Sequence, residues 1–178
     1  MELIEAIKTR RSVRRFIDKS IDRKTVARLV ETAMWAPTWK NSQTARFHVI
    51  DDRNLIKKIG MEAMPEFNMK NSETAPILVA LSAVNKRSGY EKDGTPSTIF
   101  GDAYTHFDLG CVAQTFCLAA HDEGIGTVMI GIYDPIKVKE MLNVPENEDV
   151  LILIACGYHE GEVKAPLRKS VDDVLRFV

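Results

Sequence analysis

A basic turn near the start of the chain is the first group of residues that could do chemistry. Arg10, Arg11, Ser12 and Arg14 fall within five residues, and no acidic residue lies among them to pair with the guanidinium groups. Guanidinium forks bind phosphate through paired, charge-assisted hydrogen bonds, and a hydroxyl adds a further donor. One interpretation of this turn is therefore a phosphate site. A basic corner that is merely solvated is an alternative of equal weight.

A polar segment, Ala36 to Gln43, follows and reads Ala-Pro-Thr-Trp-Lys-Asn-Ser-Gln. The amides of Asn41 and Gln43 can both donate to and accept from the edge of a heterocycle. The same composition is common in ordinary loops between a helix and a strand. Taken alone, the segment leaves both interpretations open.

Two later segments add weaker signals. Gly124 and Gly126 are not a dinucleotide fingerprint, because they do not stand between a strand and a helix in the required order. Gly131 follows an expected strand, where it could let a ligand approach the backbone or simply form a turn. Arg168, in Pro166-Leu167-Arg168-Lys169, could complete a phosphate clamp with the basic turn or lie exposed and inert.

Hydrophobic periodicity predicts the elements that must position these residues. Five helices are expected: over Leu3–Arg10, from an N-cap at Asp22 to just before Pro37, after Asp51 or Asp52, over Asp108–Glu123, and from Asp134 through Leu142. Four strands are expected: over Phe47–Ile50, Pro76–Leu81, Thr127–Ile130 and Asp149–Cys156. The Pro76–Leu81 run is apolar throughout, which predicts burial on both faces. The Asp108–Glu123 helix is apolar almost all round, so we expect its own core or a partner subunit to cover it. The alternation of helices and strands alone would suggest a doubly wound parallel sheet.

Composition limits the class of protein. A length of 178 residues favours one domain over residues 1–178, with residues 157–178 as an extended tail. The formal net charge of -1 argues against nucleic-acid or membrane partners. Three cysteines without a CxxC pair indicate a reducing, cytoplasmic setting, and the four histidines lack metal-ligand spacing, so no metal site is expected. The polar segment Asn85–Gly101 has the length of a lid, a binding loop or a disordered stretch.

The motifs, taken in order, resemble those of the FMN-dependent nitroreductases. The resemblance rests on R-R-S-x-R-x-F after a short helix, then A-P-T-x-x-N-x-Q, a long apolar helix ending in G-x-G-T, and G-Y-x-x-G-E followed by P-x-R-K, and it covers the chain from Leu3 to about Val174. It implies an α+β fold with a mainly antiparallel central sheet flanked by helices, in place of the parallel sheet. It also implies an interwoven homodimer whose C-terminal tail is exchanged and contacts the partner subunit.

The resemblance also implies roles for individual residues. Arg10, Ser12 and Arg168 would hold the FMN phosphate, and Arg11 and Arg14 would lie near the phosphate and the pyrimidine edge of the flavin. Pro37, Thr38, Trp39 and Asn41 would reach the flavin of the other subunit. Asn68 would contact the pyrimidine side of the ring, and backbone groups of Ile130 and Gly131 would lie against the ring near N5. Thr38 stands where serine is commoner in the family, and Trp39 is larger than the usual residue.

The activity implied is an NAD(P)H-dependent FMN oxidoreductase. Tightly bound FMN would accept hydride from NADH or NADPH at N5 and pass it to a nitroaromatic, quinone or similar small acceptor by ping-pong kinetics, with no catalytic side chain required. A flavin-binding, storage or sensing protein without robust NAD(P)H turnover is the alternative. A nucleotide-binding domain without flavin is a third reading, which a colourless protein would favour.

Overall fold

A computed structural model describes residues 1–178. The helices are α1 Leu3–Thr9, α2 Arg23–Ala33, α3 Arg53–Ala63, α4 Glu66–Ser72, α5 Ala103–Asp122 and α6 Pro135–Met141, with a short 3-10 turn η1 at Trp39–Asn41; the strands are β1 Ala45–Ile50, β2 Ile77–Val84, β3 Gly126–Ile130 and β4 Glu148–Gly157. Each expected element is present, with boundaries shifted by one to a few residues. The last helix of the sequence, α6, begins after Asp134, whose carboxyl group accepts hydrogen bonds from the amides of Ile136 and Lys137.

The sheet is fully antiparallel, as the family resemblance implies. The parallel sheet that the alternation of helices and strands alone suggests is not formed. Its strands lie in the order β1-β2-β4-β3, so β1 and β3 form the edges and the last strand, β4, lies inside. Strand β2 pairs with β1 on one side and with β4 on the other, both antiparallel. The register between β2 and β4 shifts at Leu81/Ser82.

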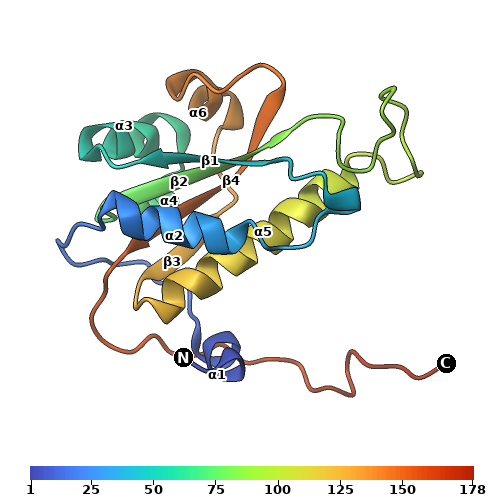
Figure 1. Cartoon of the computed structure of the whole chain (residues 1–178). Helices are drawn as coiled ribbons and strands as arrows, with labels where there is room; N and C mark the ends of the chain where they lie inside the picture. The colour runs from blue at the N-terminus through green and yellow to red at the C-terminus, as the bar shows by residue number, and fades with distance from the viewer.

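Two apolar cores lie on opposite faces of the sheet (Figure 1). On one face, α2 and α5 pack against Ile77, Val79 and Leu81 of β2. On the other face, α3 and α6 pack against Leu78 and Ala80 of the same strand. The continuous apolar run of β2 is therefore buried on both sides, as predicted, although the sheet is antiparallel.

Helix α5 is longer than its apolar pattern predicts. It begins at Ala103 instead of Asp108, so Asp108 lies inside the helix, where the side chain is only 1% exposed. Gly124 caps the C-terminal end of α5, as predicted. Gly124 adopts φ +73°, and the amides of Gly124 and Ile125 donate to the carbonyls of His121 and Ala120. These two bonds form a Schellman motif, which satisfies carbonyls at the helix end.

Two long segments, the Asn85–Gly101 loop and the chain after β4, lie outside the sheet and its helices. The Asn85–Gly101 loop folds back on itself, with an isolated bridge between Tyr90 and Pro96 and a hydrogen bond from Tyr90 Oη to Asp102. Beyond β4 the chain forms no helix or strand, and in Figure 1 it leaves the body past α1 and ends far from the sheet. No helix is both long and apolar enough to cross a membrane.

Candidate functional site

The basic turn is held against the edge strand β3 by backbone contacts. The Val13 amide donates to the Thr127 carbonyl at 2.9 Å, and Ser12 forms an isolated parallel bridge with Thr127. The approach is so close that a Cβ at Gly126 would lie 2.7 Å from Val13 Cγ2. Glycine at position 126 is therefore required for the turn to lie along β3.

Beside this turn lies a cavity of about 260 Å³, lined by Thr9, Arg10, Arg11, Val13, His121, Ile125, Gly126, Thr127, His159, Gly161, Glu162 and Val163. Arg11 Nη1 donates to the carbonyls of Lys8 and Arg10, but Arg11 Nε and His159 Nδ1 are buried without any hydrogen-bond partner. Buried polar groups are normally satisfied, so these two nitrogens indicate that something else bonds to them. The guanidinium groups of Arg10 and Arg11 favour an anion.

Two histidines from distant parts of the chain line this cavity, which the sequence did not predict. His121, from the end of α5, contacts Thr9 Oγ1 through Nε2 at 2.8 Å. Burial is the main cause that lowers the pKa of His121, and the positive charge of Arg10 lowers it further. No spacing signal could have revealed this grouping, because His121 and His159 are separated by β3, α6 and β4.

The other arginines predicted for the site do not line the cavity. Arg14 is exposed and donates from Nη1 to the Ser12 carbonyl at 3.3 Å. Arg168 lies in the exposed tail and forms no hydrogen bond or ion pair. A contact between Arg168 and a phosphate therefore stays a prediction, and it requires the tail to lie elsewhere or to come from another subunit.

Asn68, by contrast, lies close to Ile130 and Gly131. Asn68 is 6% exposed, and its Nδ2 donates to the carbonyl of Ile132 at 2.8 Å, just beyond the end of β3. Ile130 is buried and Gly131 exposed, with open space where a Gly131 side chain would be. Helix α4 is also tied to the basic turn, since Arg15 Nη1 donates to the Lys70 carbonyl at 2.8 Å.

Strand β3 links the two groups of predicted residues. Thr127, beside the basic turn, lies four positions before Gly131, which corresponds to about 13 Å along an extended chain. That distance has the scale of a mononucleotide. Asn68, Ile130 and Gly131 do not line the cavity at the basic turn.

The third predicted group, Pro37, Thr38, Trp39 and Asn41, lies at the opposite end of α5. The Trp39 amide lies 3.0 Å from both carboxyl oxygens of Asp108, and Ser42 Oγ donates to Asp108 Oδ2 at 3.3 Å. Because Asp108 and His121 are thirteen residues apart on α5, this group lies about 20 Å along the helix from the basic turn. Within one subunit, the predicted site residues therefore form two separate groups.

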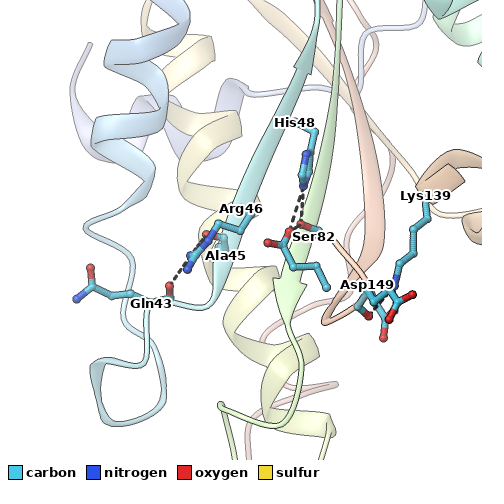
Figure 2. Close-up of polar contacts among 9 residues, drawn as sticks. Gln43, Ala45, Arg46, His48, Ser82, Lys139 and Asp149 are labelled. Atoms are coloured by element: carbon cyan, nitrogen blue, oxygen red, sulfur yellow. Dashed lines mark hydrogen bonds and ion pairs between the residues drawn. The ribbon is translucent and has the colours of Figure 1, made fainter. Parts of the chain in front are cut away.

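A further polar cluster spans three strands (Figure 2). Ser82 Oγ donates to Glu148 Oε2 at 2.7 Å, and His48 Nε2 lies 2.8 Å from Ser82 Oγ and 3.3 Å from Glu148 Oε2. In a hydrolytic triad the carboxyl group holds the ring nitrogen that does not face the hydroxyl. Here a single nitrogen meets both groups, so the cluster joins β1, β2 and β4 and has no nucleophile geometry.

The structure contains no group of three or more His, Cys, Asp or Glu side chains arranged to hold a metal ion. The cysteines are free, and burial raises the pKa of Cys117 and of Cys156. A buried thiol with a raised pKa is a poor nucleophile.

The fold and the cavity define an α+β protein with a candidate anion site at one edge of an antiparallel sheet. The Nitroreductase family model matches residues 7–158. The chain belongs to the nitroreductase family, which confirms the resemblance drawn from the motifs and, with it, the expectation of an oxidoreductase.

Individual relatives agree with this membership. A protein of Archaeoglobus fulgidus with the provisional name NADH dehydrogenase/NAD(P)H nitroreductase is 32% identical over 165 residues, which are 90% of this chain and 87% of the relative. A Methanothermobacter thermautotrophicus protein of the same name is 28% identical over 89% of this chain and 78% of its own length. The crystal structure of a nitroreductase family protein from Streptococcus pneumoniae superimposes with a TM-score of 0.85 at 25% identity, covering 99% of this chain and 100% of that one.

Proposed function

We propose that the chain acts as one nitroreductase-like domain over residues 1–178, binds FMN tightly, and transfers hydride from NADH or NADPH to a nitroaromatic, quinone or similar small acceptor. The names of its archaeal relatives support NAD(P)H as the donor. The observation that carries the proposal is the cavity beside Arg10 and Arg11, which holds two buried nitrogens without partners.

The residues present fit a phosphate-bearing flavin. Arg10, Arg11 and the Ser12 hydroxyl supply donors for a phosphate at the start of β3. Asn68 and the free backbone around Gly131 supply hydrogen-bonding groups and open space for a flat ring at the other end. Arg14 is close enough in sequence to add positive charge beside the phosphate.

A homodimer with shared sites is the second part of the proposal. Pro37, Thr38, Trp39 and Asn41 lie about 20 Å along α5 from the basic turn, so they reach a flavin only if it belongs to another subunit. Residues on the outer side of α5 are uncovered, among them Phe107, which is 64% exposed. Leu3, Ile4 and Ile7 of α1 and Leu167, Val174 and Phe177 of the tail are also exposed apolar residues. Together these exposed apolar surfaces support a dimer in which α5 packs against the partner subunit and the tail contacts it.

The protein's own contribution to the reaction is orientation and electrostatics. When bound, the flavin would supply the hydride-transfer chemistry. Arg10 and Arg11 would neutralise the phosphate, and Asn68 fixes the backbone at Ile132, just beyond the end of β3. Hydrogen-bond donors near the pyrimidine edge of the ring would favour negative charge there. No side chain of the site needs to act as a nucleophile.

The deciding experiment is spectroscopic. The protein is purified without added cofactor, its visible spectrum is recorded, and NADH and NADPH are then added separately without oxygen. A yellow protein that releases FMN on denaturation and bleaches with either nucleotide is the expected result, and it identifies the donor. Colour that persists with both nucleotides would indicate a flavin-binding or sensing protein instead. A colourless protein that FMN cannot reconstitute would overturn the proposal.

A matched pair of variants locates the cofactor. Arg10→Gln removes a cation from the cavity, whereas Arg53→Gln removes one from α3, where Arg53 only pairs with Asp18 on the surface. We expect Arg10→Gln to weaken FMN binding about tenfold, since one charge-assisted contact to phosphate is lost. Arg53→Gln should retain FMN as the unaltered protein does, measured by flavin fluorescence during titration of the apoprotein.

A further inference from the structure

A second hollow, distinct from the cavity at the basic turn, lies between η1 and the loop that follows β2. Its volume is about 580 Å³, and its walls are Trp39–Ser42 on one side and residues between Lys86 and Gly94 on the other. The Asn85–Gly101 loop thus forms a wall of a hollow, one of the roles that its length suggested.

Positive charge is concentrated around this hollow. Four of its ten lining residues are cationic, Lys40, Lys86, Arg87 and Lys92, and one is anionic, Glu91. Glu91 already pairs with Lys40 at 2.9 Å, and hydrogen bonds from Ser97 and Lys40 keep its pKa low. The side chains of Lys86, Arg87 and Lys92 form no hydrogen bond or ion pair. In a chain of net charge -1, this is a local excess that an anion would neutralise.

A single buried side chain holds both walls. Asp108 Oδ2 accepts from Ser88 Oγ at 2.6 Å on the loop wall and from Ser42 Oγ at 3.3 Å on the η1 wall. The same carboxyl group also accepts from the Trp39 amide at 3.0 Å. Because Asp108 belongs to the rigid helix α5, the two walls keep a fixed separation.

Backbone strain gathers at the same place. Five non-glycine residues have positive φ, and three of them, Lys40 (45°), Asn41 (53°) and Lys86 (53°), line this hollow. Such conformations cost free energy, and they cluster where structure serves binding. The strain is a second sign that these walls are built for a ligand.

An aromatic surface completes the hollow. Trp39 lines it and packs on Tyr104, with ring centroids 4.2 Å apart, while Lys40 Nζ lies 5.6 Å from the Trp39 ring. The Trp39 indole N–H is buried and has no acceptor in the chain. A flat ligand that carries a negative charge would match the aromatic surface and the free cations together.

We propose that this hollow binds an aromatic ligand bearing a carboxylate or phosphate, and that Arg87 and Lys92 set the preference for the charged ligand. The inference rests on the proposed function, because it makes the hollow the place where a charged aromatic acceptor or the phosphate end of the nicotinamide nucleotide is held. Both sources share the same chemistry, a ring joined to an anion.

The test is equilibrium binding to the protein as purified, measured by calorimetry without turnover. Two pairs of probes differ in the presence of an anionic group on the same ring system: 4-hydroxybenzoate against 4-hydroxybenzyl alcohol, and adenosine 2′-monophosphate against adenosine. Arg87→Gln/Lys92→Gln is compared with Lys24→Gln/Lys58→Gln, which removes the same charge from exposed positions on α2 and α3. Thermal melts establish that each variant is folded.

We expect at least one anionic probe to bind about tenfold more tightly than its neutral partner, and this preference to disappear in Arg87→Gln/Lys92→Gln only. A preference confined to 4-hydroxybenzoate assigns the hollow to the acceptor, and one confined to adenosine 2′-monophosphate assigns it to the donor. Equal binding of charged and neutral probes, or the same loss in the control variant, would overturn the inference. Since binding is measured without hydride transfer, failure of the proposed function would appear separately, as colour that does not bleach.

Discussion

Asp108 illustrates how one residue can organise two distant loops. The side chain is 1% exposed, and it accepts hydrogen bonds from the Trp39 amide, Ser42 and Ser88. Removing an acceptor that buried donors share leaves those donors unsatisfied, which costs more than the loss of any one bond. The residue therefore contributes to stability and to the shape of the hollow at the same time.

We predict that Asp108→Ala lowers the free energy of unfolding by about 3 kcal/mol, because several donors lose their partner together. Asp108→Asn keeps the shape and should cost less. Urea unfolding followed by tryptophan fluorescence measures both. Ser42→Ala, which removes only the 3.3 Å contact, is the control. A loss for Asp108→Ala no larger than that of Ser42→Ala would show that Asp108 does not organise the loops.

His121 provides a pH-dependent prediction. Its pKa is lower in the folded chain than the ordinary value of 6.5, chiefly through burial and then through Arg10. The unfolded chain therefore binds the proton more readily, so stability should decrease as pH falls from 6.5 through the folded pKa. An anion in the cavity would favour the charged ring and raise this pKa.

An NMR titration of the histidine Cε1–H signals, assigned with His121→Gln, measures the shift with and without FMN. The expected outcome is a pKa for His121 below 6.5 in the apoprotein that rises when FMN is added. An unchanged pKa in protein saturated with FMN would place the phosphate away from this cavity.

At the residue scale, the sequence predicted the basic turn and the polar segment by their types and spacing, but it did not predict Asp108, His121 or His159. Arginine clusters and Pro-Thr-Trp-Lys-Asn runs are contiguous, so a linear pattern reveals them. The expected helix began at Asp108, because the apolar pattern that predicts it begins at Leu109. The three partners of Asp108 lie on two other segments, and only the fold brings them together.

Among the elements, the C-terminal end of α5 depends on one glycine. Gly124 adopts φ +73°, with nothing within 4 Å of the position of a Cβ, so the cost of a side chain there comes from the backbone alone. We predict that Gly124→Ala lowers the free energy of unfolding by about 1 kcal/mol and the Tm by about 2–4 °C.

Gly124→Asn is the matched control, because asparagine tolerates the left-handed conformation better than other residues with a side chain. Scanning calorimetry of the three proteins should rank their Tm values as Gly124, then Asn, then Ala. An alanine variant as stable as the unaltered protein would mean that the Schellman motif adds nothing measurable.

The elements themselves were largely predictable, and the exceptions have physical reasons. The β2 run, the C-terminal end of α5 and the start of α6 carry clear apolar or capping signals. Helix α4, at Glu66–Ser72, was not predicted, because it has only seven residues and begins directly after Pro65. The antiparallel pairing followed from the family resemblance, because the alternation of helices and strands alone suggests a parallel sheet. The strand order β1-β2-β4-β3 was not predicted.

At the scale of the whole molecule, the tail has few contacts of its own. Residues 164–178 are exposed throughout, and their side chains include Leu167, Val174 and Phe177. We predict that deletion of residues 165–178 leaves the far-UV circular dichroism of the body intact but halves the mass in solution and reduces FMN retention. Light scattering coupled to size exclusion measures the mass.

Arg168→Gln in the chain without the deletion separates two effects of this deletion. It should reduce FMN binding while the mass stays that of a dimer, if Arg168 contacts the phosphate and the apolar residues hold the partner. A truncated chain that remains a dimer would show that α5 and α1 suffice for association.

The position of β4 has a consequence for how the chain acquires its structure during synthesis. Residues 148–157 form an inner strand, hydrogen-bonded to β2 on one side and to β3 on the other. When the ribosome has made β1, β2 and β3, the two halves of the sheet still lack the strand that joins them. Most of the sheet therefore closes only after residue 157 has been made, a late closure between segments distant in sequence. Until then, the apolar β2 strand has an unpaired edge, and the nascent chain depends on rapid completion or on chaperones to avoid aggregation.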